Sequence, residues 1–564
     1  MLMVGWQGRA QAYGVTMAGA NAEAAAEGTE AGRAEAVAAG VQDEAAQRAT
    51  RAMLADPATH GGAAVRQVRT HAAIVFLAGE RAWKMKRAVR FPYLDFSTVE
   101  ARRLACEAEI RLNRRTAPEI YEAVVPVTCG PDGRPRIGGE GAAIDWLVRM
   151  RRFDENQVLD RLAEGGHIDI GLVEALADHV AAFHGAADPR PDRGGAEAMR
   201  RVVETNARAM ADRAAVLDPV AAEALTTATL AALEAVAPLL ERRRREGFVR
   251  LAHGDLHLGN ICLVDGRPRL FDALEFDEGL TAIDTVYDVA FLVMDLLARG
   301  LVRHANRFVE RYVERTGDLA GLALLPLGLS MRAAIRAHVS AAIADGSEEP
   351  GPHVRAARRY LDLARRLLEP VPPRLVAVGG LSGSGKSTVA RGLAPWIGAP
   401  PGALVLRSDV VRKRLAGIDP AERAGSEAYA AGTSERVYEA LRHAAATALA
   451  AGRTVIVDAV HARLEERAAV EAVARRLGVP FAGLWLDAPA GALIERVERR
   501  QGDVSDATAD IVRQQLRYAL GEVAWRRVAA ASGPAEVAAA VGRLLGLDEA
   551  AVLDMAQCRD APGP

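Results

Sequence analysis

Residues 380–388 form a glycine-rich run whose composition suits the binding of nucleotide phosphates. The run follows the apolar stretch Leu375–Gly379 and precedes a helical pattern over Thr388–Leu393. Glycine lets successive backbone N–H groups turn toward phosphate oxygens, and a helix N-terminus adds partial positive charge. In this pattern Lys386 reaches the outer phosphates and the Ser387 hydroxyl ligates Mg²⁺. The predicted nucleotide-binding residues are Gly380, Ser382, Gly383, Ser384, Gly385, Lys386, Ser387 and Thr388.

The scarcity of lysine strengthens this interpretation. Of 71 Lys and Arg residues, only four are lysine, namely Lys84, Lys86, Lys386 and Lys413. A chain that uses arginine wherever any cation suffices retains lysine where a compact ammonium is needed. We therefore expect Lys386 to have a catalytic role at the phosphates.

Two further carboxylates end apolar runs in the same part of the chain. Asp458 closes Val455–Val457 and is predicted to hold magnesium beside the phosphate loop. Asp409 follows the run that begins at Leu404, and Arg412 lies three residues later. Asp409 is a candidate base for an acceptor hydroxyl, and Arg412 is a candidate contact to an anionic substrate.

Arginines on a helical stretch before the polar segment 502–506 suggest a mobile lid. Arg496 and Arg500 are placed to neutralise a transferred phosphoryl group. An ordinary solvated helix face is the alternative.

A second candidate site begins with His253-Gly254-Asp255-Leu256-His257 and continues to Asn260. The strand Ile261–Val264, a turn and a returning strand then bring Asp272 back to the end where Asn260 lies. The oxygens of Asn260 and Asp272 predict a site for a hard cation such as Mg²⁺. Asp255 projects there as a base or as a group that orients the acceptor. Two alternatives remain, a metal-hydrolase cluster of His253, Asp255 and His257, and a loop of capped turns.

Upstream residues complete a pattern around this loop. Lys84 and Lys86 share one face of a predicted strand, because alternate residues point the same way. Glu107 and Glu109 follow on a predicted helix over 98–114 that packs against this strand, and Glu107 is taken as the cofactor-site residue.

The order of lysine, helix glutamate, Asp-x₄-Asn loop and hairpin aspartate resembles the protein-kinase-like fold. The His-Gly-Asp element resembles the aminoglycoside phosphotransferase and choline-kinase branch of that fold. This resemblance implies that Asp255 orients the acceptor, that Asn260 and Asp272 bind magnesium, and that Lys84 or Lys86 contacts the α- and β-phosphates. No Gly-x-Gly-x-x-Gly precedes the lysines, so His71–Glu80 is expected to cover the nucleotide in another way.

The second half resembles small P-loop (Walker A) kinases of the zeta-toxin, polynucleotide-kinase and gluconate-kinase type. The whole chain resembles fusions described as bifunctional aminoglycoside phosphotransferase and ATP-binding proteins. The resemblance implies ATP and Mg²⁺ as cofactors and a small hydroxylated acceptor. A regulatory nucleotide-binding protein with a degenerate first module and a polynucleotide kinase are the alternatives.

Composition limits the partners. A net charge of −2 over 564 residues argues against a nucleic-acid or membrane-surface partner. No apolar run is judged long enough to span a bilayer, and four widely separated cysteines indicate no disulfide framework. The cytoplasm is the expected location.

Two domains are expected, in the α+β and α/β classes. The first is a protein-kinase-like domain, and the second is a parallel sheet flanked by helices, because strand-like and helical runs alternate there. The predicted segments are an extension that is disordered or loosely helical (1–55), the kinase-like domain (56–369), a proline-rich linker (370–374), the P-loop domain (375–545) and a C-terminal tail (546–564).

Overall fold

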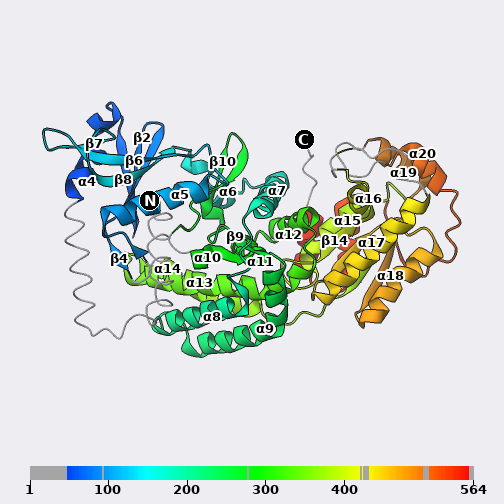
Figure 1. Ribbon diagram of the computed structural model, residues 1–564. Coiled ribbons are helices and arrows are strands. Elements are labelled where there is room, and N and C mark those ends of the chain that lie inside the picture. The colour runs from blue at the N-terminus through cyan, green and yellow to red at the C-terminus, as the bar shows by residue number, and fades with distance from the viewer. Residues whose placement is uncertain are drawn as a thin grey trace. The chain divides into compact units, whose positions relative to one another are not determined.

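The computed structural model describes residues 47–70, 72–91, 94–275, 278–418, 422, 431–499, 507–531 and 533–557. The chain divides into two compact units (Figure 1). The first comprises Met1–Gly300 and Leu324–Leu368, and the second comprises Leu301–Ala323 and Glu369–Pro564. The boundary between the two units at residues 368 and 369 lies beside the predicted linker. The segment Leu301–Ala323 differs from the prediction, because it lies inside 56–369 yet belongs to the second unit.

An antiparallel sheet of six strands opens the first unit, in the order β1-β2-β3-β8-β6-β7. Its strands are β1 (Val65–Arg69), β2 (Ala73–Ala78), β3 (Arg81–Lys86), β6 (Tyr121–Cys129), β7 (Pro135–Ile137) and β8 (Ala143–Arg151). A short ribbon of β4 (Arg90–Phe91) and β5 (Leu94–Asp95) follows β3. Helix α5 (Val99–Asn113) packs against β6 and β8, and Thr98 caps its first turn.

The last part of the predicted extension is ordered. Residues 48–55 form helix α4 (Arg48–Ala55), whose Leu54 side chain is fully buried against the sheet. The Gln47 amide donates to the Lys86 carbonyl (2.9 Å) and to Asp145 (2.6 Å). These contacts correct the expectation of a loose extension up to residue 55, because a buried leucine and a bonded amide offset the entropy of ordering. The predicted segment before Gln47 lies outside the described residues.

The rest of the first unit is mostly helical. It contains η1 (Pro57–His60), η2 (Glu155–Gln157), α6 (Leu159–Glu164), α7 (Ile170–Ala186), α8 (Gly195–Ala211), α9 (Pro219–Arg245), α10 (Glu278–Thr281), α11 (Thr285–Ala298), α13 (Leu325–Asp345) and α14 (Pro350–Arg366). Two strands, β9 (Val249–Leu251) and β12 (Ala282–Asp284), pair within it. The hairpin of β10 (Ile261–Val264) and β11 (Arg267–Leu270) follows η3 (Leu258–Asn260).

Among the residues that the structure describes, two helices are long and apolar enough to cross a membrane by length and composition, contrary to expectation. They are α9 and the stretch Ala320–Asp345, which joins η4 (Ala320–Leu324) to α13. The apolar window of Ala320–Asp345 is 78% buried inside the protein, as in a core helix, and that of α9 is 22% buried.

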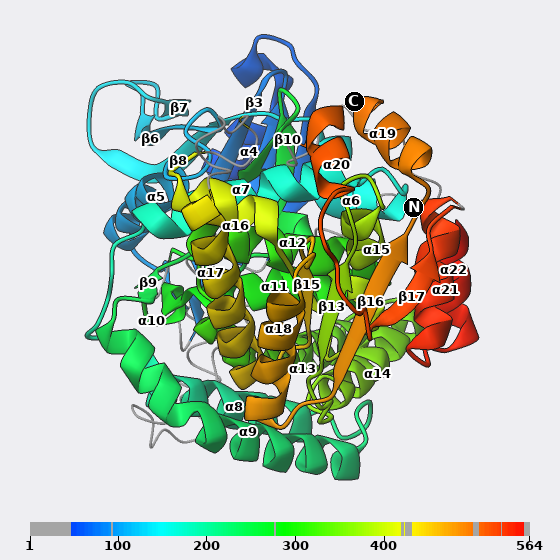
Figure 2. The same cartoon turned by 90° about the vertical axis from the view of Figure 1, so that its right-hand side faces the viewer.

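The second unit is a parallel sheet of five strands with helices on both faces (Figure 2). Its strands are β13 (Leu375–Gly379), β14 (Leu404–Arg407), β15 (Val455–Asp458), β16 (Phe481–Asp487) and β17 (Arg526–Ala529), in the order β14-β15-β13-β16-β17. Its helices are α12 (Val302–Thr316), α15 (Lys386–Leu393), η5 (Ala394–Trp396), α16 (Ser408–Leu415), α17 (Ala431–Ala450), α18 (Leu464–Leu477), α19 (Ala490–Glu498), α20 (Ala509–Gln515), α21 (Pro534–Leu544) and α22 (Glu549–Gln557). Val376 and Val378 face the core formed with α15, α21 and α22.

The predicted C-terminal tail contains a packed helix. Helix α22 buries Val552 and Met555 in the core of the second unit, so this unit extends beyond residue 545. Residues 558–564 of the predicted tail lie outside the described residues.

Helix α12 is the earlier chain segment that completes the second unit. It packs against η5 and β14, and Asn306 donates to the Ala403 carbonyl at 2.9 Å. Its Arg307 pairs with Glu310 at 3.0 Å, and both side chains are more than nine-tenths buried. Burial lowers the pKa of Arg391 on α15, and the charges of Arg407 and Arg307 add to this effect. The helix therefore joins a buried charge cluster beside the phosphate-loop helix.

Candidate active sites

The phosphate loop connects β13 to α15, as predicted. Gly380 and Gly383 have φ of 139° and 85°, which side-chain-bearing residues rarely adopt. A Cβ atom at Gly380 would lie 2.6 Å from the Leu486 carbonyl oxygen, and one at Gly383 would lie 2.4 Å from that of Leu493. Glycine is therefore required at both positions. The Lys386 ammonium donates to the Leu381 carbonyl at 3.0 Å, so it folds back over the loop.

The loop's backbone and hydroxyl groups have distinct partners. The Ser382 N–H donates to the Gln515 side chain of α20 at 2.8 Å. The Ser384 hydroxyl is buried and has no hydrogen-bond partner in the described part of the chain. Thr388 is exposed on the first turn of α15.

The structure brings the two predicted magnesium residues of this unit together. The Ser387 hydroxyl donates to Asp458 at 2.6 Å, and Arg407 Nε lies 3.5 Å from the same carboxylate oxygen. Parallel strands β13 and β15 place the loop and Asp458 at one sheet edge. A hydroxyl and a carboxylate in contact match the oxygen donors that hold Mg²⁺ beside a phosphate loop, so the residues fit the ion.

The remaining predicted residues of the second unit are less closely associated. Asp409 lies in the first turn of α16 and is half-buried, so it begins a helix instead of ending a strand. Arg412 is buried, and one guanidinium nitrogen lies 3.5 Å from the Ser434 hydroxyl of α17. Arg496 donates weakly to the Ala531 carbonyl at 3.4 Å. Arg500 and segment 502–506 lie outside the described residues, so their lid role remains a prediction.

A buried ionic cluster in the first unit contains both lysines of β3. Glu109 of α5 is fully buried and lies 2.7 Å from the Lys84 ammonium and 2.6 Å from that of Lys86. Lys84 also contacts Asp272 at 2.7 Å, and Lys86 pairs with Glu275. Lys84 is therefore the lysine beside the predicted magnesium aspartate.

The choice of Glu107 as the cofactor-site glutamate is wrong. Its side chain is 46% exposed and pairs with Arg103 on the surface of α5. Glu109 occupies the buried face of the helix with Cys106 and Asn113, which lie three and four residues away from it. Helical periodicity therefore turns Glu109 toward the sheet and Glu107 toward solvent.

Substituting Glu109 with alanine is expected to destabilise the first unit by about 3–5 kcal/mol, because two buried ammonium groups lose a shared counter-charge. Urea denaturation of the full chain measures this change. Glu107→Ala on the same helix is the matched control and should stay within about 0.5 kcal/mol of the parent. Equal effects of the two substitutions would contradict the assigned pairing.

The Glu109 carboxyl also predicts a pH dependence of stability. Burial alone would raise its pKa, but Lys84 and Lys86 lower it to about 2. A carboxyl with a depressed pKa in the folded state stabilises the protein above its unfolded pKa, near 4.3, and loses this contribution as pH falls toward 2. Glu109→Gln should therefore flatten the acid limb of the stability curve in this window. A parallel limb in parent and variant would refute the assignment.

Asp288 of α11 holds the His-Gly-Asp loop in place through hydrogen bonds to its backbone. Its carboxylate accepts the His253 N–H at 3.1 Å and the Gly254 N–H at 2.9 Å, and it contacts His184 at 3.0 Å. The buried His253 ring lies 3.1 Å from the Phe271 carbonyl. These bonds tie the loop to the segment before Asp272.

The two carboxylate oxygens of Asp255 differ in their hydrogen bonding. Asn260 donates its amide to Oδ2 at 2.7 Å, and His257 lies 3.4 Å from the same oxygen. Oδ1 is buried without a partner among the described residues. Burial would raise the Asp255 pKa, but His257, His253 and Arg332 together lower it to about 2. The carboxylate is ionised at neutral pH and offers one acceptor oxygen.

The β10–β11 hairpin brings Asn260 and Asp272 to one end, as predicted. The Phe271 N–H donates to the Asn260 carbonyl at 3.0 Å, and the Tyr121 hydroxyl accepts the Asp272 N–H at 3.0 Å. Asp272 has φ of 61°, a strained value that these bonds hold in place. The amide oxygen of Asn260 and the carboxylate of Asp272 are donors of the type that Mg²⁺ takes with nucleotide phosphates.

The arrangement disfavours the hydrolase alternative. The His253 ring is directed to the Phe271 carbonyl, and His257 Nδ1 accepts the Gly259 N–H at 3.0 Å. Within the described ranges, no group of three or more His, Cys, Asp or Glu side chains could hold a metal ion.

The segment expected to cover the nucleotide is a strand. From Ala73 onward it is β2, which is buried throughout, and a tight connection closed by Thr70 and Ala73 precedes it. His71 lies outside the described residues.

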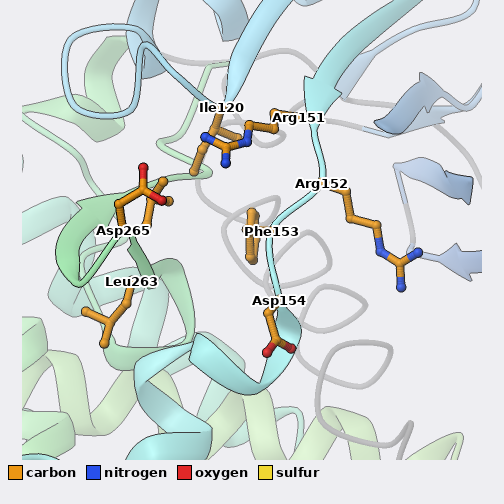
Figure 3. A pocket seen from close by; sticks show the side chains of 8 residues that line it. Ile120, Arg151, Arg152, Phe153, Asp154, Leu263 and Asp265 are labelled. Carbon is orange, nitrogen blue, oxygen red and sulfur yellow. The ribbon is translucent and has the colours of Figure 1, made fainter. Parts of the chain in front are cut away.

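A pocket elsewhere in this unit is lined by Ile120, Arg151, Arg152, Phe153, Asp154, Leu263, Val264 and Asp265 (Figure 3). It includes none of the predicted site residues.

The first unit combines an antiparallel sheet with helices, and the second carries a phosphate loop on a parallel sheet, which confirms the predicted fold classes. The AAA domain family model matches residues 375–520. Over 455 residues, 78% of this chain and 87% of the relative, the chain is 31% identical to the uncharacterized protein Rv2004c of Mycobacterium tuberculosis. The uncharacterized protein Mb2027c of Mycobacterium bovis matches equally. The chain belongs to the family of these mycobacterial proteins.

Solved structures of kinases are similar to parts of the chain. A choline/ethanolamine kinase family protein from Mesorhizobium loti is 16% identical, with a TM-score of 0.37, covering 57% of this chain and 94% of that chain. A gluconokinase from Sinorhizobium meliloti is 22% identical, with a TM-score of 0.23, covering 33% of this chain and 94% of that chain.

Proposed function

We propose that the protein is an ATP- and Mg²⁺-dependent phosphotransferase with two active sites, each acting on a small hydroxylated acceptor. The observation that carries this proposal is the contact between Ser387 and Asp458 at the end of the phosphate loop. The ionised Asp255, with its open oxygen beside Asn260, supports the same chemistry in the first module. The net charge of −2 supports a small acceptor in preference to a nucleic acid, and we place the reaction in the cytoplasm.

In each module the acceptor hydroxyl oxygen attacks the γ-phosphorus, and the bond from that phosphorus to the β-phosphate bridging oxygen breaks. The hydroxyl proton passes to a carboxylate, Asp255 in the first module and Asp409 in the second. ADP leaves with the bridging oxygen. Mg²⁺, when bound, neutralises phosphate charge. Lys84 and Lys386 position the phosphates of their respective sites.

The test is to incubate the full chain with Mg²⁺ and γ-labelled ATP and a panel of sugars, aminoglycosides, choline and a short oligonucleotide. A phosphorylated small molecule is the expected product. If the oligonucleotide were the only compound to become labelled, the protein would be a polynucleotide kinase. Tight ATP binding with no phosphorylated product would refute the proposal and favour a regulatory nucleotide-binding protein.

A further inference from the structure

A histidine beside the phosphate loop has no role in the steps above. His461 lies three residues after Asp458, and the Gly380 N–H donates to the carbonyl of its neighbour Val460 at 3.2 Å. Strands β13 and β15 are adjacent and parallel, and β16 lies on the other side of β13. The chain order reverses direction at β13, and ligands of open α/β sheets bind outside the carboxyl ends of the strands at such a point. His461 is therefore placed at the ligand-binding edge.

The backbone of His461 is held in a strained conformation. Its φ is 49°, which is uncommon for a residue with a side chain. The Tyr438 hydroxyl accepts its N–H at 3.0 Å, and Arg467 donates to its carbonyl at 2.9 Å. Surroundings that fix a strained residue so firmly are a feature of functional sites.

The imidazole ring is enclosed but not hydrogen-bonded. His461 is 1% exposed, and its ring lies 5.5 Å from that of Tyr438 and 5.1 Å from that of Trp525. Neither ring nitrogen has a hydrogen-bond partner among the residues that the structure describes. Each unsatisfied buried polar atom costs about 1–3 kcal/mol, so packing alone would favour an apolar ring here.

The ring is neutral at physiological pH. Burial, followed by the charges of Lys386 and Arg467, lowers the His461 pKa to about 3. A neutral imidazole has one N–H donor and one acceptor nitrogen, which match hydroxyl groups, whereas phosphate and carboxylate oxygens only accept.

We propose that His461 determines acceptor specificity in the second module, with its two ring nitrogens binding hydroxyl groups of a polyhydroxylated, sugar-like acceptor. This inference rests on the proposed phosphotransferase function and names the acceptor class of that site.

The test compares His461→Phe and His461→Asn in the full chain with His443→Phe, an exposed histidine on α17. The acceptors are D-gluconate, D-glucose, glycerol and myo-inositol with Mg²⁺-ATP. His461→Phe should raise the acceptor KM on the order of 10- to 100-fold, the loss of two hydrogen bonds, and leave the affinity for Mg²⁺-AMPPNP unchanged. His461→Asn, which tolerates the positive φ and keeps a donor and an acceptor, should partly restore the KM. His443→Phe should match the parent.

Ring nitrogen signals provide a readout that does not depend on turnover. ¹⁵N-histidine spectra of the AMPPNP-bound chain should show the His461 ring signals shifting when one of the four acceptors is added. Such a shift without product would retain the role of His461 and reject phosphotransfer. An unchanged acceptor KM in His461→Phe, a parallel loss of AMPPNP affinity, or no shift with any of the four compounds would overturn the inference.

Discussion

Replacing Lys386 with methionine is expected to lower the phosphotransfer rate of the second module by about 10²- to 10³-fold. The flexible side chain of Lys386 lets its ammonium stay close to the negative charge that develops on the transferred phosphoryl group. Methionine keeps the length of the side chain and removes its charge. Lys386 is half-buried at the start of α15, and methionine preserves most of its aliphatic chain, so folding should be little affected. Product formation is measured in an Asp255→Asn background, which silences the first module.

Lys386→Arg serves as the control for charge alone. A guanidinium is larger and planar, and we expect it to recover little of the rate because the loop accommodates a compact ammonium. Thermal unfolding of both variants should match that of the parent. Undiminished turnover in Lys386→Met would reject the phosphate loop as a catalytic element.

Replacing Asp255 with asparagine is expected to lower the rate of the first module by about 10²- to 10⁴-fold, the usual contribution of a positioned proton acceptor. The substitution keeps the shape of the side chain and removes the charge that orients the acceptor hydroxyl. Because the Asp255 pKa is about 2, the carboxylate stays ionised from mildly acidic to alkaline pH. The parent rate should therefore show no fall near pH 4–6 that arises from this group.

The matched control is Asp265→Asn in the exposed turn of the neighbouring hairpin. Asp265 has φ of 50°, a value that asparagine also tolerates, so the local backbone is preserved. Labelled product is measured for both variants in a Lys386→Met background. Equal rates for Asp255→Asn and Asp265→Asn would remove Asp255 from the mechanism.

Parts of both sites are predictable from sequence where the functional residues lie close together in the chain. This holds for the phosphate loop, for Asp458 at the end of its strand and for the hairpin from Asn260 to Asp272. The helix glutamate was not assigned correctly, although the signal was present. Glu109 shares the helix face of Cys106, Ile110 and Asn113, whereas Glu107 lies on a charged stripe with Arg103.

Other features depend on contacts between distant parts of the chain. The sequence around His461 contains no motif, and its enclosure by Tyr438 and Trp525 comes from two separate elements. The sequence predicts a tail where α22 lies, and local periodicity does not say which core α12 or α22 joins. These parts of the structure follow from long-range packing that spacing rules do not encode.

Helix α12 has a consequence for the order in which the chain can fold during synthesis. It leaves the ribosome before α13 and α14, which belong to the first unit, while its own unit is still unmade. Asn306 bonds to Ala403, 97 residues later, which is roughly 5–20 s of translation at about 5–20 residues per second. During that interval Phe308 and Tyr312, buried in the finished protein, have no core to join. A gene divided at the proline linker would therefore encode a P-loop half that lacks one of its own helices.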